Sequence, residues 1–431
     1  MRKRFSGIVI SAAMVSTTGL STAFAVESSI RPEPRPASRA ASSPASASLA
    51  PEVSNVRVSN AEFARWIEGF RRRARAQGIS DATFAQAFSG IQYDTEVIRR
   101  DRNQAEFTKA IWEYLDSAVS QTRIANGRDA MRKHARVLAE IEGRYGVPAS
   151  IVTAVWGLES AYGSYRGSND IVESLATLAF DGRRGEFFES QLIAALKILQ
   201  NGDVAPRNMT GSWAGAMGHT QFIPTSYLDY AVDFRGDGRR DIWSDDPTDA
   251  LASTAAYLAR HGWVKGQPWG MEVRLPQGFD YSLTGDGVRK SVAQWTRLGV
   301  RNAAGQQVPN HGTASILIPG GARGAAFMTF KNFNVIERYN AADAYVIGVG
   351  HLADRLIGGP AIQASWPRGD RALKLAERRE LQQRLTRAGF STGGVDGKIG
   401  PKTQDAVRAY QRSVGMVPDG YASLEVLTRL R

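Results

Sequence analysis

The segment GVPASIVTAVWGLESAYG, residues 146–163, predicts a buried helix with one acidic side chain near its end. Pro148 suits the first turn, where a backbone N–H would have no partner, and Gly163 suits a helix stop, because glycine readily adopts a left-handed conformation. Between them an apolar stripe recurs at helical spacing through Ile151, Val155 and Leu158. The pattern therefore indicates a helix that packs into the core of the fold.

Glu159 is the side chain of chemical interest in this helix. It follows Val155 by four residues and Trp156 by three, so its carboxyl group projects from, or beside, the apolar face. Burial against apolar groups disfavours the charged form and raises the pKa of a carboxyl, which is what a general acid needs near neutral pH. The structural alternative is a glutamate at the edge of the stripe that pairs with a nearby arginine. Spacing alone leaves both open.

The sequence on both sides of this segment indicates a mainly α-helical domain. Between Phe63 and Gly359, amphipathic helical patterns alternate with Gly-rich and aromatic-rich loops. Four such patterns are Phe63-Trp66-Ile67-Phe70, Phe107-Ile111-Tyr114-Leu115, Val137-Ile141 and Leu192-Ala195-Leu196-Leu199. Extended patterns are scarce, and segments 271–273 and 315–318 predict at most a small sheet.

Length and composition limit the class of protein. At 431 residues, of which 43% are hydrophobic, the chain can bury a substantial core and form more than one domain. The absence of cysteine excludes disulfides, thiolate metal sites, a cysteine nucleophile and a lipid anchor on an N-terminal cysteine. Residues 1–25 join a basic start to an apolar stretch and small residues, the layout of a cleavable signal peptide. No later apolar run reaches the ~20 residues of a membrane span, so we expect an exported, soluble protein.

Two polar stretches divide the rest of the chain. Residues 26–55 are rich in Pro, Ala and Ser and predict a linker, and residues 359–370 predict a second one. They separate a body, 56–358, from a tail, 371–431, whose pattern of helix, Gly-rich turn, helix, turn and short helix predicts a small three-helix domain. The formal net charge of +12 and the basic tail suit an anionic polymer such as cell wall or nucleic acid, although many exported proteins are simply basic.

Five motifs in the body carry a resemblance to a known family. They are WGLESAYG (156–163), GSWAGAMGHTQFIPTSY (211–227), AVDFRGDGRRDIW (231–243), AAYLARHGWVKG (255–266) and YNAADAYVIGVGHLADRL (339–356). In this order they closely resemble the lytic murein transglycosylase B family. The resemblance implies a lysozyme-like helical catalytic domain that cleaves the bond between N-acetylmuramic acid (MurNAc) and N-acetylglucosamine (GlcNAc) in peptidoglycan.

The same resemblance implies a role for Glu159. It protonates the glycosidic oxygen, and as a carboxylate it then deprotonates the C6 hydroxyl of the muramoyl sugar, which leaves a 1,6-anhydro end. One carboxyl can suffice where the acetamido group of the substrate stabilises the reacting carbon, and no second carboxylate stands out within the matched motifs near Glu159. Further residues are implied in binding the glycan: Ser212, Gln221, Tyr257, Asn340, Tyr345 and, on a shorter motif, Tyr114. The basic pair Arg183 and Arg184 is implied to meet peptide or lactyl carboxylates.

The segment 231–250 resembles a divergent calcium loop. Asp233, Asp237 and Asp249 are its candidate ligands, because a hard cation needs several oxygens at alternating positions. Arg235 stands where such loops usually offer an oxygen, so an acidic loop held by Asp–Arg pairs is the alternative. A calcium ion here would be structural, and the reaction is expected to need no cofactor.

The tail resembles the three-helix peptidoglycan-binding module of wall hydrolases. Its signature includes Gly394-Val395-Asp396-Gly397 and Val417-Pro418-Asp419-Gly420, and its implied role is to anchor the catalytic domain on its insoluble substrate. We therefore expect peptidoglycan strands as the partner, possible contacts with other cell-wall enzymes, no nucleic acid, no membrane span and no lipid anchor. The periplasm of a Gram-negative bacterium is the expected location. A hydrolytic muramidase and a non-catalytic wall-binding scaffold are the competing hypotheses.

Overall fold

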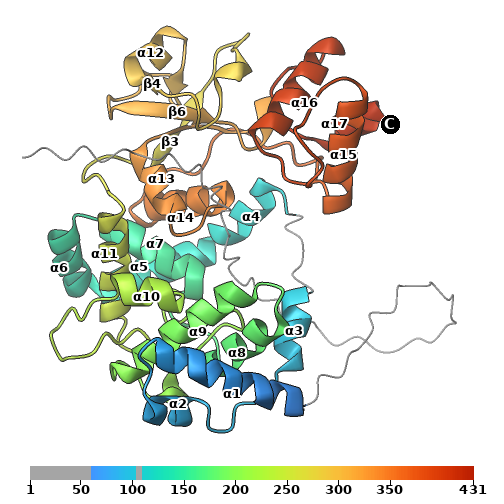
Figure 1. Cartoon of the computed structure of the whole chain (residues 1–431). Coiled ribbons are helices and arrows are strands. Elements are labelled where there is room, and N and C mark those ends of the chain that lie inside the picture. Colours follow the sequence, from blue (N-terminus) through green and yellow to red (C-terminus); the bar gives the residue numbers. More distant parts are fainter. Residues whose placement is uncertain (1–59, 103–108) are drawn as a thin grey trace, which may run out of the picture.

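The computed structural model describes residues 60–102 and 109–431, which form a helical body, a small sheet and a three-helix module (Figure 1). The predicted signal peptide and first linker, 1–25 and 26–55, lie outside the described residues, as does Phe107. The prediction of a mainly α fold with a small sheet is confirmed. No helix in the described part of the chain is both long and apolar enough to cross a lipid bilayer.

The body is built from helices that occur in two runs along the chain. The first run is α1 (Asn60–Ala76), α2 (Asp81–Ala87), α3 (Thr95–Arg102), α4 (Ile111–Ala118), α5 (Gln121–Lys133), α6 (Ala135–Tyr145), α7 (Ala149–Ser160), α8 (Ile171–Asp181), α9 (Gly185–Gln200), the 3₁₀ turn η1 (Pro206–Asn208), α10 (Pro224–Tyr230) and α11 (Thr248–Arg260). The second run, after the sheet, is α13 (Lys331–Glu337) and α14 (Asp343–Leu356). A short ribbon of β1 (Asn169–Asp170) and β2 (Thr210–Gly211) joins two loops of the body.

Helix α7 lies at the centre of the body. It packs against α5, α6, α11 and α14, and nine of its twelve residues are buried, as expected of a helix that is apolar all round. It ends at Ser160, three residues before the predicted stop at Gly163, because Ala161 and Tyr162 already have positive φ angles of 48° and 59°. This early end places Glu159 in the last turn of the helix.

The lower lobe in Figure 1 supports α7 from one side. Its centre is the antiparallel pair α8 and α9, against which α1, α2, α3 and α10 pack. The predicted apolar stripe of α1 is confirmed: Phe63 and Phe70 are buried, and Trp66 stacks on Phe70 with ring centroids 5.3 Å apart. Phe63 and Trp66 also pack edge-on against Phe180 of α8, with ring centroids 5.4 and 6.0 Å apart, which joins α1 to the α8–α9 pair.

A five-stranded antiparallel sheet lies on the other side, above α13 and α14 (Figure 1). Its order is β4 (Lys290–Ser291), β6 (Thr313–Leu317), β7 (Ala326–Thr329), β3 (Gly270–Arg274) and β5 (Arg301–Asn302). The two predicted extended segments, 271–273 and 315–318, fall on β3 and β6. Helix α12 (Val292–Arg297) closes a separate small core, and the 3₁₀ turns η2 (Tyr281–Leu283) and η3 (Gly321–Arg323) lie in its loops. The fully buried Trp295 of α12 donates to the carbonyl oxygen of Ala314 at 2.9 Å.

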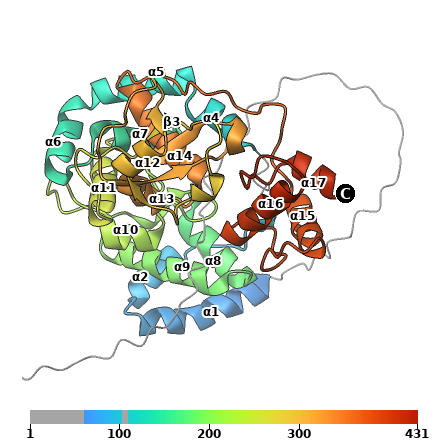
Figure 2. The ribbon, with the colours of Figure 1, turned by 90° about the horizontal axis from the view of Figure 1, so that it is seen from above.

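The tail forms its own core from α15 (Leu375–Arg387), α16 (Pro401–Ser413) and α17 (Leu424–Leu430), as the sequence predicts. It docks beside the sheet, as both views show (Figures 1 and 2). The guanidinium of Arg408 is buried at this contact and donates to the hydroxyl of Thr284 at 3.2 Å. A carboxylate oxygen of Asp419 accepts from the amide of Ala322 at 2.8 Å. The module is therefore held against the body by one buried and one partly buried polar contact.

The stretch between body and tail also packs on the body. Trp366 lies against Phe327 of β7, with ring centroids 6.5 Å apart, and Arg368 forms a two-pronged ion pair with Asp116 of α4 at 2.7 and 2.9 Å. The amide of Ala364 donates to a carboxylate oxygen on β3 at 2.6 Å. The segment predicted as a linker thus runs along the body surface, although its boundaries stay a prediction.

Candidate active site

The carboxyl of Glu159 meets one buried hydroxyl group. Helix α14 crosses beside α7, and the hydroxyl of its Tyr345 donates to Oε1 of Glu159 at 2.6 Å. Tyr345 is only 2% exposed, whereas Glu159 is partly exposed at the end of its helix. Within residues 60–102 and 109–431 no arginine is within ion-pair distance of Glu159, so the arginine-paired alternative is wrong. The site holds a carboxyl with a neutral donor instead.

Burial dominates the electrostatics of this carboxyl. Desolvation raises the pKa of Glu159 to about 7, and the hydrogen bond from Tyr345, which favours the carboxylate, offsets this only in part. Burial and the charge on Glu159 raise the pKa values of Tyr114, Tyr339 and Tyr345 as well. Three tyrosine rings therefore surround the glutamate, and its two protonation states are close in free energy near neutral pH.

The turn that follows Glu159 is strained. Ala161, Tyr162 and Gly163 are all left-handed, and each non-glycine residue in that region costs about 1–3 kcal/mol unless its surroundings impose it. Tyr162 is fixed by a hydrogen bond from its hydroxyl to the carbonyl oxygen of Arg123 at 2.8 Å. Its ring lies so close to Gly157 that a Cβ there would approach it to 2.6 Å. The sharp turn ends α7 directly after the catalytic candidate.

The loop 211–222 carries two residues implied in glycan binding. The hydroxyl oxygen of Ser212 accepts from the amide of Ala216 at 3.0 Å, which closes a tight turn. Gln221 has a φ of 56°, and its side-chain NH₂ donates to the carbonyl oxygens of Arg166 and Gly218 at 3.0 and 2.8 Å. Both side chains thus brace the backbone of the loop.

Two tyrosines in edge-on contact and an asparagine connect this loop to α14. Tyr257 is buried and donates to the carbonyl oxygen of Arg338 at 2.5 Å, and its ring packs edge-on against Tyr339, with centroids 5.1 Å apart. Tyr339 donates to the carbonyl oxygen of Thr220 at 2.6 Å. The side-chain oxygen of Asn340 accepts from the amide of Ala342 at 3.1 Å, directly before α14 begins. The sequence prediction missed Tyr339, although it opens the same motif as Asn340.

The basic pair before α9 has a protein partner. Arg183 and Arg184 each lie 2.8 Å from a carboxylate oxygen of Asp101, which is 2% exposed on α3. The guanidinium of Arg184 also lies over the ring of Phe188, 4.8 Å from its centroid. These contacts fasten α3 to α9. Half of the Arg183 side chain stays exposed.

The acidic loop 231–250 closes on its own backbone. Asp233 accepts from the amides of Gly236, Asp237 and Gly238 at 2.6–3.2 Å, and the buried carboxylate of Asp249 accepts from two more amides. Burial, with a smaller contribution from the charges of Asp233 and Asp237, raises the pKa of Asp249 to about 6. Two Asp–Arg ion pairs also tie this loop to its surroundings: Arg240 pairs with Asp203 at 2.5 Å, and Asp245 pairs with Arg166 at 2.8 Å.

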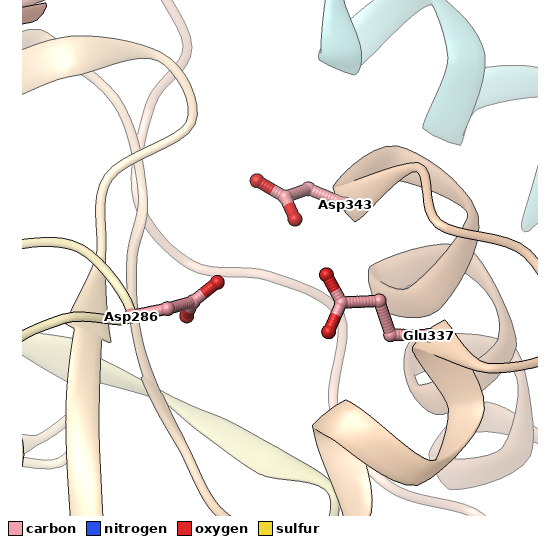
Figure 3. A group of neighbouring side chains, drawn as sticks. All are labelled: Asp286, Glu337 and Asp343. Atoms are coloured by element: carbon pink, nitrogen blue, oxygen red, sulfur yellow. The ribbon is translucent and has the colours of Figure 1, made fainter. Parts of the chain in front are cut away.

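A second acidic group was not predicted from the sequence. Asp286 from a loop of the sheet, Glu337 at the end of α13 and Asp343 at the start of α14 place carboxylate oxygens within 4.8 Å of one another (Figure 3). Burial and then the charges of the other two raise the pKa of Asp343 to about 7. Asp286 is some fifty residues distant in the chain, so no local spacing could have signalled the cluster.

Comparison with known proteins places this geometry in a family. Residues 62–354 match the family described as "Transglycosylase SLT domain", and residues 374–430 match "Putative peptidoglycan binding domain". The chain belongs to the SLT-domain lytic transglycosylase family. SltB3 from Pseudomonas aeruginosa, solved with NAG-NAM-pentapeptide and with NAG-anhNAM-pentapeptide, is 50% identical over 86% of this chain and 99% of that chain, with a TM-score of 0.84.

Two relatives from Escherichia coli are more distant. "Membrane-bound lytic murein transglycosylase B" is 35% identical over 246 residues, 56% of this chain, and the chain spans 65% of the length of that protein. The lytic transglycosylase Slt35, solved in complex with calcium, is 30% identical over 69% of this chain and 93% of that chain, with a TM-score of 0.59. The predicted lytic transglycosylase resemblance is confirmed, and so is that of the tail.

Proposed function

We propose that this lytic transglycosylase cleaves the β-1,4 bond between MurNAc and GlcNAc without water and leaves 1,6-anhydroMurNAc ends, in cell-wall remodelling or turnover. The observation that carries the proposal is a partly exposed carboxyl with a pKa raised to about 7, held by one buried hydroxyl. A group with this pKa can both give and take a proton at neutral pH. The complexes of SltB3 with NAG-NAM-pentapeptide and NAG-anhNAM-pentapeptide support the same substrate and product for this chain.

The proposed reaction needs one carboxyl in two states. Protonated Glu159 gives its proton to the glycosidic oxygen as the bond from that oxygen to C1 of MurNAc breaks, and GlcNAc leaves with a free hydroxyl. The substrate's acetamido group stabilises the electron-poor C1. The C6 hydroxyl oxygen then bonds to C1 and its proton passes to Glu159, which regenerates the acid. Tyr345 stabilises the carboxylate between the two steps through its 2.6 Å hydrogen bond.

We further propose that the residues around Glu159 form the glycan groove. They are Ser212, Gln221, Tyr257, Asn340, Tyr345 and Tyr114. Because the side-chain NH₂ of Gln221 and the hydroxyl of Tyr257 already donate to backbone carbonyls, these two would act chiefly by holding the shape of the groove. Arg184 would act by fastening α3, and the half-exposed Arg183 is the better candidate to meet a substrate carboxylate.

The experiment is mass spectrometry of the soluble products released from purified peptidoglycan. We expect anhydromuropeptides from the wild type and none from Glu159→Gln. Glu173→Gln is the matched control, since the pKa of Glu173 is also raised by burial but its carboxylate accepts from the amide of Gln92, away from the site. Products with reducing ends would mean a muramidase, and no release by the wild type would mean a wall-binding scaffold.

We also propose a location and an anchor. Residues 1–25 direct export to the periplasm of a Gram-negative bacterium, 26–55 form a linker, and the tail, from residue 371 on, holds the enzyme on peptidoglycan, where other cell-wall enzymes are candidate partners. We propose in addition that the catalytic domain ends at residue 358 and that the second linker ends at residue 370. Retention of a 371–431 deletion on insoluble peptidoglycan at wild-type level would contradict the anchoring role.

A structural calcium ion in the loop 231–250 is the last part of the proposal. Asp233, Asp237 and Asp249 fit a cation in one respect: burial and, to a smaller extent, the charges of the other two carboxylates raise the pKa of Asp249, and a bound cation would favour its ionised form. The solved complex of Slt35 with calcium supports the idea. The ion would stabilise the loop and take no part in the reaction, which requires no cofactor.

A further inference from the structure

His219 joins the end of α7 to the loop 211–222 through its ring. The indole N–H of Trp156 donates to Nδ1 of His219 at 3.1 Å, and Nε2 of the same ring lies 2.7 Å from the carbonyl oxygen of Ser244. Both His219 and Trp156 are buried, 4% and 3% exposed. The indole can only donate to Nδ1 and the carbonyl oxygen can only accept from Nε2, so these two shorter contacts fit a neutral imidazole with its proton on Nε2. A guanidinium nitrogen of Arg166 lies farther from the same Nε2, at 3.3 Å.

The backbone of His219 binds the residue next to the catalytic candidate. Ser160, which follows Glu159, donates its hydroxyl to the carbonyl oxygen of His219 at 2.5 Å and accepts from the amide of Gly163 at 2.9 Å. The imidazole also fills the space under the left-handed turn: a Cβ on Gly163 would approach its Nδ1 to 2.5 Å. His219 therefore touches the strained turn through both its ring and its backbone.

A chain of contacts connects His219 to Gln221, two residues later, through Arg166 and Ser244. Gln221 is itself left-handed and donates to the backbone of Arg166. The Arg166 guanidinium donates to the carbonyl oxygen of Ser244, the group that the His219 ring also meets. One network thus links the turn after Glu159, the loop of Gln221 and the segment around Ser244.

We propose that neutral His219, protonated on Nε2, is a positioning residue that fixes the carboxyl of Glu159 relative to the loop of Gln221. The inference rests on the proposed catalytic role of Glu159 and adds a second titrating group to the reaction. When the ring takes a proton on Nδ1, the indole N–H of Trp156 faces another donor. The link to α7 is then lost and turnover falls, although Glu159 itself is still in its acid form.

The charges around the ring are consistent with a neutral state at working pH. Burial lowers the pKa of His219, the carbonyl of Ser244 raises it, the charge of Arg166 lowers it again, and two carboxylates add smaller upward contributions. Those carboxylates are Asp245 and Asp241. His134, between α5 and α6, also packs edge-on against Trp156, with ring centroids 5.5 Å apart. In a plot of activity against pH, we therefore assign the fall on the acid side (the acid limb) to His219, at a pH below the ordinary histidine pKa of about 6.5. The fall on the alkaline side (the alkaline limb) is set by Glu159.

The first test reads the tautomer in the full-length wild type by nitrogen-15 NMR of labelled histidine at neutral pH. We expect the proton on Nε2 and an unprotonated Nδ1. A proton on Nδ1, or on both nitrogens, would overturn the inference whatever the enzyme does to peptidoglycan. This readout is independent of the proposed function.

The second test compares pH profiles of anhydromuropeptide release for wild type, His219→Gln and the control His134→Gln. We expect His219→Gln to lose about tenfold in kcat with little change in KM, as for a catalytic group that is slightly misplaced, and to lose the acid limb. The control should keep both limbs. If His219→Gln fails to fold, Trp156→Phe replaces it and should move the acid limb to higher pH. An acid limb that is the same in wild type and variant overturns the inference; no product from wild type at any pH means that the proposed function has failed instead.

Discussion

Replacing Tyr345 by phenylalanine tests how the carboxyl of Glu159 is tuned. The change removes the hydroxyl that donates to Oε1 at 2.6 Å and keeps the buried ring, so it leaves no large cavity. In the wild type this hydrogen bond stabilises the carboxylate form of Glu159. Removing the hydroxyl therefore raises the pKa of Glu159 above the wild-type value of about 7. A hydrogen bond to a charged group contributes on the order of 1.5–3 kcal/mol, and each pH unit corresponds to about 1.4 kcal/mol.

The assay is the pH dependence of kcat for anhydromuropeptide release. In Tyr345→Phe we expect the alkaline limb to move upward by about one to two pH units, and kcat at neutral pH to fall about tenfold because the carboxylate that accepts the C6 proton is less stable. The matched control is Tyr227→Phe, which also loses a buried hydroxyl but one that donates to the carbonyl oxygen of Arg240. An alkaline limb that stays in place in Tyr345→Phe, while activity falls, would refute the reasoning.

Three further predictions concern stability. Folding raises the pKa of Glu159, so ionisation of Glu159 destabilises the folded protein as pH rises above the unfolded pKa of about 4.3. Glu159→Gln should therefore raise Tm at pH 8, by an amount equivalent to about 1–3 kcal/mol, but not at pH 4. An equal change at both pH values would contradict this. Gly157→Ala should destabilise the fold by roughly 1–3 kcal/mol in chemical denaturation, because the new Cβ meets the ring of Tyr162, whereas Gly143→Ala in open space on α6 should not. Calcium should raise the Tm of the wild type in a thermal scan against a chelator and leave that of Asp249→Asn unchanged; equal responses would place any ion elsewhere.

The sequence predicts α7 and its glutamate well because both depend on local spacing. Apolar residues that recur along 146–163 describe a buried helix whatever surrounds it, and Glu159 follows from the stripe and the family motif. The end of the helix is different. Ala161 and Tyr162 have no intrinsic preference for a left-handed backbone, and the contact of Tyr162 with Arg123 that imposes it comes from α5. A stop at glycine is therefore the best that local rules can give.

Contacts between distant segments explain the other differences. The sequence predicts that Arg183 and Arg184 bind a substrate carboxylate, but in the structure both pair with the carboxylate of Asp101 on α3. The polar composition of residues 359–370 predicts a linker, but Trp366 within this segment packs on Phe327 of the sheet. In each case the partner lies far along the chain, where no periodicity can indicate it. The resemblance to the family motifs identified the residues around Glu159 because residues that are neighbours in the fold, although distant in the chain, recur together in those motifs. Spacing along one segment carries no such information.

The measurement that tests the central claim most directly is digestion of peptidoglycan by the wild type in water enriched in oxygen-18, followed by mass spectrometry of the soluble fragments. If Glu159 directs attack by the C6 hydroxyl of the substrate, the fragments carry anhydro ends, one water lighter than reducing ends, and contain no heavy oxygen. Fragments with a heavy oxygen at a reducing MurNAc end would show that water is the nucleophile, and would contradict the account.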